Sequence, residues 1–271
     1  MPMLSITDSE FNQFRRFIFE ATGISMANGK QALVSGRLAR RLAHLQLGSY
    51  GEYIELLDSG ADAAEHQIAV DLLTTNETYF FREPRHFAAL RSSAQAWREA
   101  GRCEAPFRVW SAACSSGEEP YSIAMTLSDV LAERPWELVG SDISSRVLAR
   151  ARSGHYQMER LERMPPEYLK RFCLKGQGPQ TGTMLIEKAL RRRVQFMQVN
   201  LNQELPPLGM FDVIFLRNVM IYFNLETKRQ VVARILSHLK PGGYLYVGHS
   251  ETLNEISSAV KPLAPSIYRK A

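Results

Sequence analysis

Apolar residues recur at helical spacing through the first 75 or so positions of the chain. Thr7 and Glu10 have the spacing of a capping box, and Gly23 is a typical helix stop. Apolar side chains between them recur every three or four residues, at Phe11, Phe14, Phe17 and Ile18. Similar spacing predicts further helices over 29–46, 50–58 and 62–74. We therefore predict an all-helical N-terminal domain over 1–75.

From about residue 105 the pattern changes to short apolar runs that alternate with helical stretches. The apolar runs predict strands within 107–114, 137–143, 192–200, 211–218, 244–250 and 266–271. The stretches between them predict helices at 119–133, 144–153 and 225–239. Strands that alternate with helices indicate a parallel sheet with right-handed crossovers. The fold class is therefore predicted to be α/β, with this sheet in a second domain over 76–271.

One segment, 172–190, departs from the alternation. Its sequence, FCLKGQGPQTGTMLIEKAL, places three glycines and a proline between short apolar pieces. We interpret it as a small antiparallel β-excursion inserted between a helix and the next main strand. The alternative is a long disordered loop.

Composition places the chain among ordinary globular proteins, with 45% hydrophobic and 23% charged residues in 271. No apolar run has transmembrane length, and the N-terminus lacks the basic and apolar regions of a secretory signal. The cysteines, Cys103, Cys114 and Cys173, form no CxxC pair, so neither a zinc site nor a disulfide framework is expected. We expect no metal and a cytoplasmic location.

A basic stripe lies on the predicted second helix, beside its apolar face. Its members follow 3/4/7 spacing: Arg37, Arg40, Arg41 and His44. The formal net charge is +5 and the isoelectric point is near 9.1, which suits an acidic partner. The stripe is either a solvated face or a docking surface for an acidic helix. The basic run 191–193 enters a strand and lacks interleaved aromatics, so no nucleic-acid partner is expected.

The stretch VWSAACSSGEEPYSIAM (109–125) has the strand–turn–helix pattern at which many α/β proteins bind a nucleotide-like ligand. It contains a single glycine, Gly117, and the carboxylates of Glu118 and Glu119 would repel a pyrophosphate. A cationic ligand without phosphate, such as S-adenosylmethionine, would instead be attracted. The acids also suit a purely structural role, because carboxylates favour the first turn of a helix.

Polar residues follow three further predicted strands. Asp142 stands about one βαβ unit after the corner, where an acid usually accepts hydrogen bonds from ribose hydroxyls; the alternative is a helix N-cap. The side-chain amide of Asn200 can reach the edge of an adenine. Arg217, Asn218 and Tyr222 fall at the carboxyl ends of the strands, where open α/β folds bind ligands.

These residues lie within motifs that resemble the CheR family of chemotaxis-receptor glutamate methyltransferases. The motifs are LLTTNETYFFREPRHF, VWSAACSSGEEPYSIAMTL, FDVIFLRNVMIYF and LKPGGYLYVGHSE. The resemblance covers nearly the whole chain. It implies a Rossmann-like S-adenosylmethionine-dependent methyltransferase sheet with a small inserted antiparallel β-subdomain, preceded by the helical domain. The implied reaction esterifies glutamates on the cytoplasmic helices of methyl-accepting chemoreceptors and yields S-adenosyl-L-homocysteine.

The resemblance also implies site residues. The implied cofactor contacts are Asn76, Thr78, Arg82, Glu118, Asp142, Asn200, Leu201, Arg217 and Asn218. Between the paired acids, we choose Glu118 because it is nearer the turn. In some members of the family the β-subdomain, here 172–190, binds a short aromatic-containing peptide at the receptor's C-terminus, and the glycine spacing of KGQGPQTG resembles that of the peptide-binding members. The resemblance also implies that the enzyme reaches the membrane only through the receptor.

A glutamate side chain is ionised at neutral pH, so it needs no general base before it attacks the sulfonium methyl. Arg82 can present a two-pronged donor to that carboxylate, and Tyr222 can donate a hydrogen bond. The structural alternatives are an ion pair of Arg82 with Glu83 or Glu118, and a core position for Tyr222. The functional alternatives are methylation of another protein or a small acid, and a non-catalytic module that binds S-adenosylmethionine.

Overall fold

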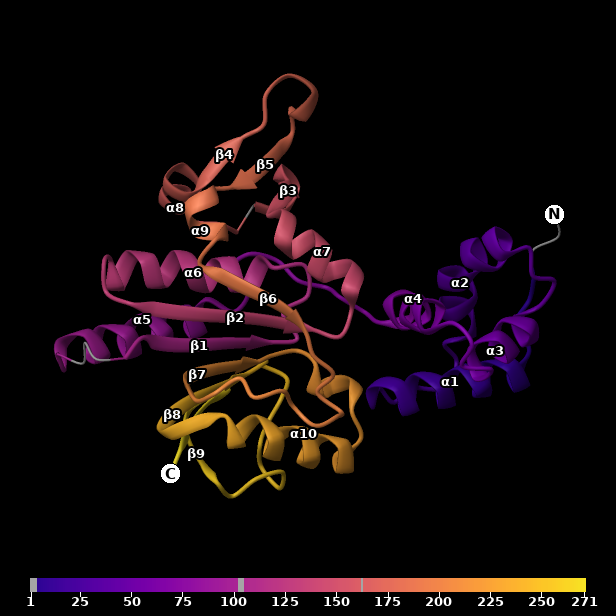
Figure 1. The fold of residues 1–271 in the computed structure, drawn as a ribbon. Helices are drawn as coiled ribbons and strands as arrows, with labels where there is room; N and C mark the ends of the chain where they lie inside the picture. Colours follow the sequence, from indigo (N-terminus) through magenta and orange to yellow (C-terminus); the bar gives the residue numbers. More distant parts are fainter. Residues whose placement is uncertain (1–3, 102–104, 162) are drawn as a thin grey trace.

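The computed structural model describes residues 4–101, 105–161 and 163–271 and divides the chain into a helical bundle and a larger sheet domain (Figure 1). The bundle consists of α1 (Asp8–Thr22), α2 (Gln31–Leu45), α3 (Tyr50–Asp58) and α4 (Ala63–Leu73). It has its own buried core, to which Phe14, Leu38 and Tyr53 belong. The helices expected in this region are therefore confirmed.

Both ends of α1 form as the sequence predicts. The amide of Glu10 donates to Oγ1 of Thr7, 3.2 Å away, and the amide of Thr7 donates to the Glu10 carboxylate, 2.8 Å away. This is the complete capping box. At the other end Gly23 takes a left-handed conformation with φ of 78°. The turn after Gly23 directs the chain towards the sheet domain.

The main sheet has the order β6-β2-β1-β7-β8-β10-β9. Its strands are β1 (Phe107–Ala112), β2 (Trp136–Asp142), β6 (Val194–Gln198), β7 (Phe211–Leu216), β8 (Leu239–Val247), β9 (Val260–Ala264) and β10 (Ile267–Lys270). The pairings from β6 to β8 are all parallel, as predicted. β10 instead runs antiparallel to β8 and β9, and β9 was not predicted. The two-residue link between β9 and β10 explains why these two strands run antiparallel, because only antiparallel strands can be joined by so tight a turn.

Helices cover both faces of this sheet (Figure 1). α5 (Pro84–Glu99) and α6 (Glu118–Leu131) pack against each other and bury one face, together with Phe215. α10 (Leu225–Ser237) buries the other face, together with Ile214. α7 (Ser145–Ser153) packs beside β2 and β6. Sequence periodicity did not identify α5. Within the described ranges, no helix is both long and apolar enough to cross a membrane.

A second, three-stranded antiparallel sheet stands apart from the main sheet, in the order β3-β5-β4. It is formed by β3 (His155–Gln157), β4 (Cys173–Lys175) and β5 (Thr183–Ile186), with α8 (Pro166–Phe172) and α9 (Lys188–Arg191) and the short 3-10 turns η1 (Met158–Leu161) and η2 (Gly178–Gln180). The antiparallel excursion is confirmed and the disordered-loop alternative is wrong. The predicted bounds, 172–190, were too narrow, because β3 lies well before them and pairs with β5 only after the chain folds back.

The helical bundle contacts the edge of the sheet domain through the end of α1. Nδ2 of Asn200 donates to the carbonyl of Ala21 at 2.8 Å, and the amide of Ser25 donates to the carbonyl of Tyr222 at 2.7 Å. A Cβ on Gly23 would lie 2.9 Å from side-chain atoms of its neighbours, so the close approach needs glycine. The bundle therefore adjoins the carboxyl ends of the parallel strands.

Candidate active site

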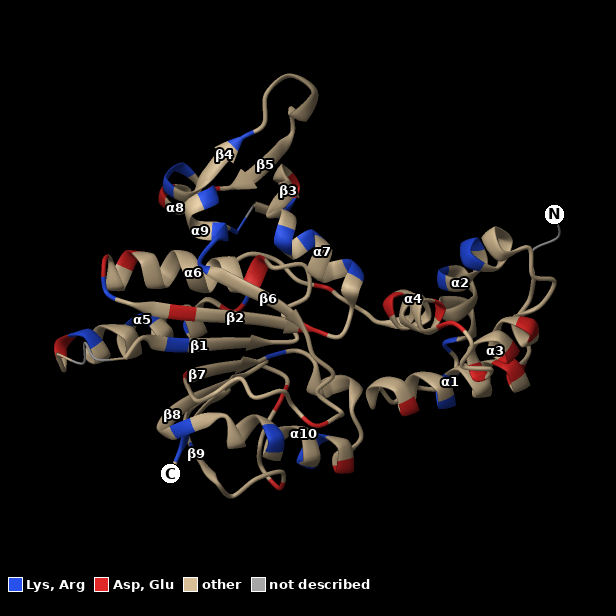
Figure 2. Ribbon diagram, viewed as in Figure 1, with Lys and Arg blue, Asp and Glu red and all other residues tan. Residues whose placement is uncertain are grey.

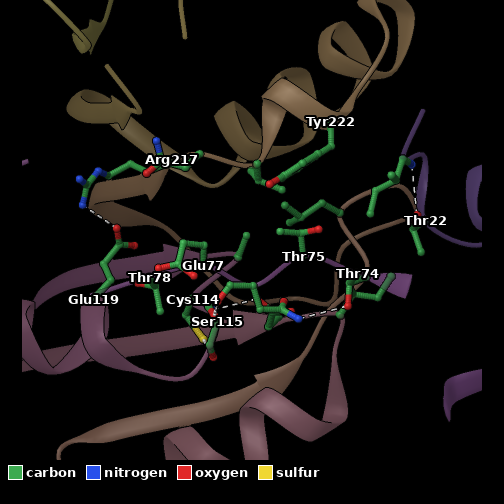
Figure 3. A pocket seen from close by; sticks show the side chains of 18 of the residues that line it. Thr22, Thr74, Thr75, Glu77, Thr78, Cys114, Ser115, Glu119, Arg217 and Tyr222 are labelled. Carbon is green, nitrogen blue, oxygen red and sulfur yellow. Dashed lines mark hydrogen bonds and ion pairs between the residues drawn. The ribbon is translucent and has the colours of Figure 1, made fainter. Parts of the chain in front are cut away.

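A pocket lies at the carboxyl ends of β1, β2, β6 and β7, where the chain segments of both domains meet (Figure 3). The linker between the domains contributes Thr74, Thr75 and Glu77, and the turn after β1 contributes Ser115. Tyr222 reaches in from the segment after β7 (Figure 3). The loops at this edge can present polar side chains to a ligand because the rigid strands that precede them fix where the loops lie.

The turn after β1 is the corner that the sequence singled out. Gly117, the N-cap of α6, has φ of 96°, and a Cβ there would lie 2.8 Å from the hydroxyl of Tyr156. Glycine is therefore required for packing against the β-subdomain as well as for the turn. The hydroxyl of Tyr156 also donates to the carbonyl of Ser116 at 2.7 Å. The β-subdomain thus supports the corner from behind.

The paired acids at the start of α6 point in different directions. Glu118 is 0% exposed and does not line the pocket; its carboxylate accepts from Arg160 at 2.9 Å and from Ser116 at 2.7 Å. Glu119 lines the pocket and accepts from Arg217 at 2.7 Å. Helical geometry explains this, because successive residues face about 100° apart. The structure thus favours Glu119 over Glu118, our choice from the sequence, as the pocket carboxylate.

Asp142 ends β2 and lines the pocket with its side chain largely buried. Its carboxylate accepts from the amide of Ser115 at 2.8 Å and from the amide of Ser144 at 3.0 Å. Burial raises the pKa of Asp142, although these two amide donors oppose the shift. Ser144, and not Asp142, is the N-cap of α7. The N-cap alternative for Asp142 is therefore wrong, and the carboxylate faces the pocket with acceptor positions to spare.

Arg217 follows β7 and is only 5% exposed. One guanidinium nitrogen donates to Glu119 and another to Glu83, at 2.7 and 2.9 Å. Burial acts to raise the pKa of Glu83, but the Arg217 charge and the hydrogen bonds from Arg217, His249 and Asn218 together outweigh it and hold that pKa below its usual value. Nε of Arg217 is buried and has no hydrogen-bond partner among the described residues. The pocket wall thus contains an arginine with one donor still unsatisfied.

Asn218 is held by a residue that sequence analysis did not assign to the site. Asn218 has φ of 57°, and its backbone N–H donates to the carboxylate of Glu251, 2.8 Å away. The buried Glu251 carboxylate also accepts from the amides of Gly248 and Ile221, at 2.6 and 3.2 Å. Burial raises the pKa of Glu251, while these backbone donors oppose the shift. Glu251 therefore shapes the loop that carries Arg217 and Asn218.

The guanidinium of Arg82 lines the pocket without a carboxylate partner. It donates to the carbonyl of Glu77 at 3.0 Å and lies 5.7 Å from the ring centre of Tyr79. No carboxylate of the described chain lies within ion-pair distance of it. Glu83 is paired with Arg217 and Glu118 with Arg160, so the predicted alternative of a structural ion pair for Arg82 is wrong.

Tyr222 is half-buried and lines the pocket, so the alternative of a core aromatic is also wrong. Its hydroxyl makes no hydrogen bond to any other residue that the structure describes. A phenol of this kind keeps both its donor and its acceptor free for a ligand. Arg82 and Tyr222 are therefore two pocket residues whose hydrogen-bond donors are free to bind an anion.

The remaining predicted contacts, Asn76, Thr78, Asn200 and Leu201, all line the pocket. Asn200 differs from expectation in one respect. Its side chain donates to Ala21 and accepts from the amide of Asn202, at 2.8 and 3.0 Å. One donor and one acceptor position of the amide are thus engaged in holding the end of α1, and one N–H and one lone pair remain.

The basic stripe borders a surface groove next to this pocket. Thr74, Thr75, Asn76 and Glu77 line both the groove and the pocket. Figure 2 shows the basic residues on α2 and on α7, which adds Arg146 to the groove. Arg37 donates to the carbonyl of Leu73 at 2.6 Å, and Arg41 pairs with Glu65, whereas Arg40 and His44 are exposed. Arg37 and Arg41 thus stabilise the helical domain, whereas Arg40 and His44 are free to contact a partner.

Several pocket residues escaped the sequence analysis because nothing local marks them. They include Thr22, Ile24, Thr74, Thr75, Glu77, Tyr79, Ile143, Val199 and Phe223. Thr22 and Ile24 come from the end of α1. The antiparallel bridge between Ile24 and Phe223, with the hydrogen bonds from Asn200 to Ala21 and from Ser25 to Tyr222, brings them to the sheet domain. Ile143 and Val199 are exceptions, because their position at the ends of strands could have identified them.

Comparison with known proteins gives similarity over nearly the whole chain. Residues 9–74 match the all-alpha domain of the CheR methyltransferase family, and residues 76–268 match its SAM binding domain. The chain is 43% identical to chemotaxis protein methyltransferase 2 of Pseudomonas aeruginosa, over 98% of this chain and 94% of that protein. It is 41% identical to the chemotaxis protein methyltransferase of Escherichia coli K12, over 98% and 92% of the two chains.

Proposed function

Because the chain belongs to the CheR methyltransferase family, we propose that it esterifies glutamate side chains of chemoreceptors, with S-adenosylmethionine as the methyl donor. It is a methyltransferase that acts in chemotaxis adaptation. The observation that carries the proposed chemistry is the pair of free donors, Arg82 and Tyr222, in a pocket whose other charged groups are already paired or acidic.

The pocket suits S-adenosylmethionine in charge and in hydrogen-bonding groups. Three acids line the pocket, Glu77, Glu119 and Asp142, and they outnumber its two cations, Arg82 and Arg217. The wall is therefore net acidic, as a ligand with a sulfonium and an ammonium requires. Asp142 offers acceptors for ribose hydroxyls. We propose these residues, with Asn76, Thr78 and Leu201, as the cofactor contacts.

We expect Glu119→Gln to weaken S-adenosylmethionine binding at least about tenfold, because it removes a pocket charge and loosens Arg217. Glu118→Gln is the matched control, since the neighbouring carboxylate faces Arg160 and not the pocket. We expect it to change the affinity less than about threefold. Calorimetric titration of both variants measures the difference. Equal losses in the two variants would contradict the assignment of Glu119.

S-adenosylmethionine supplies an electrophilic methyl group on a sulfonium. The protein must hold the substrate carboxylate without neutralising its charge, because the charged form is the nucleophile. The free guanidinium of Arg82 binds one or both carboxylate oxygens and fixes their direction. The Tyr222 hydroxyl donates to the same group. Neither residue takes a proton, because a glutamate side chain is already ionised at neutral pH.

The groove beside the pocket suits an acidic helical substrate. Arg40 and His44 are exposed on its wall, and Arg146 adds a further cation from α7. The linker residues shared with the pocket give a continuous path from the stripe to the reacting groups. We propose that the groove receives the helical bundle of the receptor's cytoplasmic part, which implies a cytoplasmic site of action.

Reversing one charge in the groove tests this docking. Arg40→Glu should raise KM for receptor methylation about three- to tenfold, because an attractive contact of roughly 1 kcal/mol becomes repulsive. The effect should shrink at high salt, and affinity for S-adenosylhomocysteine should not change. Lys261→Glu is the matched control on the exposed edge strand β9. An equal rise in KM with Lys261→Glu would show that only net charge matters.

The β-subdomain offers an edge for a receptor C-terminal peptide. Among the strands that the structure describes, β4 pairs only with β5, and its Leu174 is 52% exposed. We propose that an aromatic-containing C-terminal peptide adds as a further strand beside β4. The exposed leucine would pack against it.

Calorimetric titration with such a peptide should give saturable binding. We expect Leu174→Glu to weaken that binding about tenfold, the loss expected when a buried leucine contact of about 1.5 kcal/mol disappears. Leu263→Glu alters a similarly exposed leucine on β9 and should leave the binding intact. Absence of binding by the unaltered chain would remove peptide recognition from the account.

Two rival functions share the cofactor pocket. A methyltransferase for another protein or a small acid would label receptor fragments no better than unrelated acidic helices. A non-catalytic module would bind S-adenosylmethionine but transfer nothing. Transfer of labelled methyl groups to receptor fragments, with the methylated glutamates either present or replaced by alanine, separates the three. Label that depends on those glutamates supports the proposal.

A further inference from the structure

A compact group of metal-binding side chains lies behind the pocket wall. It consists of Glu83 at the N-cap of α5, His86 in its first turn and His249 after β8. One potential ligand atom from each lies within 4.8 Å of the others. Oε2 of Glu83 is 3.4 Å from Nδ1 of His86 and 3.9 Å from Nε2 of His249. Two imidazoles and a carboxylate are a donor set that suits zinc and neighbouring transition metals.

His86 supplies independent support for a ligand here. Its side chain is 0% exposed, yet neither ring nitrogen has a hydrogen-bond partner among the described residues. Buried imidazoles normally have such a partner. The ring is held in place by stacking on Tyr246, with centroids 5.5 Å apart.

We propose that Glu83, His86 and His249 bind one divalent transition metal ion of the Zn²⁺ class. In a tetrahedral site with bonds of 2.0–2.2 Å, donor atoms lie roughly 3.3 Å apart. The two measured separations, 3.4 and 3.9 Å, need only a small contraction. The side chain of His249 is 51% exposed, so an ion can enter from solvent and a water molecule can complete the coordination.

The proposed metal shares a ligand with the pocket. The Glu83 carboxylate receives Arg217 at 2.9 Å and Asn218 at 3.3 Å. A bound ion would compete with the Arg217 cation for the same oxygen and would draw Glu83 away from Arg217, which lines the pocket. Metal and S-adenosylhomocysteine should therefore bind antagonistically, each weakening the other by the same factor. This antagonism rests on the proposed cofactor pocket, whereas the metal site itself does not.

Titration of the untagged, metal-free chain with Co²⁺ tests the site without any assay of activity. We expect one equivalent of Co²⁺ to produce saturable visible absorption that Zn²⁺ abolishes. Loss of a residue that only supports a metal ligand lowers metal affinity roughly 10–100-fold. Loss of a ligand itself should lower it further, so His249→Ala should bind Co²⁺ at least about 100-fold more weakly than the unaltered chain. The exposed His66 lies in the helical domain, and His66→Ala should bind as the unaltered chain does. No saturable signal, or equal binding by His249→Ala, would overturn the proposal.

Calorimetry with S-adenosylhomocysteine then tests the antagonism. Saturating Zn²⁺ should weaken binding several-fold in the unaltered chain and should have no effect on His249→Ala. If Co²⁺ binds at the three residues but Zn²⁺ leaves the S-adenosylhomocysteine affinity unchanged, the antagonism is wrong and the site stands. If S-adenosylhomocysteine does not bind even without Zn²⁺, the proposed cofactor pocket fails, while the Co²⁺ titration still decides the metal site.

Discussion

Arg82→Ala should lower kcat for receptor methylation between about 10- and 1,000-fold, the range seen when a donor that positions or stabilises a reacting group is removed. The physical reason is that Arg82 is the pocket arginine whose guanidinium has no carboxylate partner in the described chain. Its loss leaves the substrate carboxylate free to turn. Because no buried ion pair is broken, the variant should fold, and its affinity for S-adenosylhomocysteine should change far less than kcat.

Arg163→Ala provides the matched control. Arg163 donates to the hydroxyl of Tyr79 at 2.8 Å and lies 4.4 Å from the centre of the same ring that Arg82 approaches. It is exposed and does not line the pocket. Its removal should leave kcat unchanged. Near-normal turnover of Arg82→Ala at saturating donor and receptor would end the catalytic role, as would an equal loss in both variants.

Asp142→Asn should weaken binding of both S-adenosylmethionine and S-adenosylhomocysteine about 100-fold. Hydrogen bonds to a charged acceptor contribute about 1.5–3 kcal/mol each, and asparagine cannot accept from the amides of Ser115 and Ser144 and from ribose hydroxyls together. The measurement is calorimetric titration with each ligand. Because the ribose is common to both, the two affinities should fall by the same factor.

Asp212→Asn separates the loss of a ligand contact from general damage to the sheet. Like Asp142, Asp212 accepts a hydrogen bond from a backbone amide, that of Arg108, 2.8 Å away. Asp212 lies on β7, however, and does not line the pocket. Its variant should keep full affinity even if it melts at a lower temperature. Unaltered affinity in Asp142→Asn, with a normal melting temperature, would contradict the ribose assignment.

Local patterns were sufficient to predict most of the fold. The capping box at Thr7, the strand that ends at Asp142 and the helix after Gly117 depend on neighbours within a few residues, so their sequences specify them. The antiparallel course of β10 and the pairing of β3 with β5 depend on residues far apart in the chain. Short strands with little periodicity give no signal for such pairings.

The site residues also fall into two groups, those that local sequence patterns predict and those that depend on contacts between distant parts of the chain. Residues at strand ends, such as Asp142 and Arg217, could be identified because parallel strands bring their carboxyl ends to one edge. The choice between Glu118 and Glu119 depends on which way the first turn of α6 faces, and Arg160, the partner of Glu118, lies 42 residues away in the chain. Glu251 and Thr22 contribute through tertiary contacts alone. Sequence analysis could not have assigned them.

The central claim is that this chain transfers a methyl group to a carboxylate of a chemoreceptor. Its most direct test is incubation of the purified chain with labelled S-adenosylmethionine and bacterial membranes that contain chemoreceptors, followed by mild alkali. The account predicts label on the receptor that alkali releases as methanol, because a glutamate methyl ester hydrolyses readily. Label that resists alkali, or no transfer to the receptor, would contradict it.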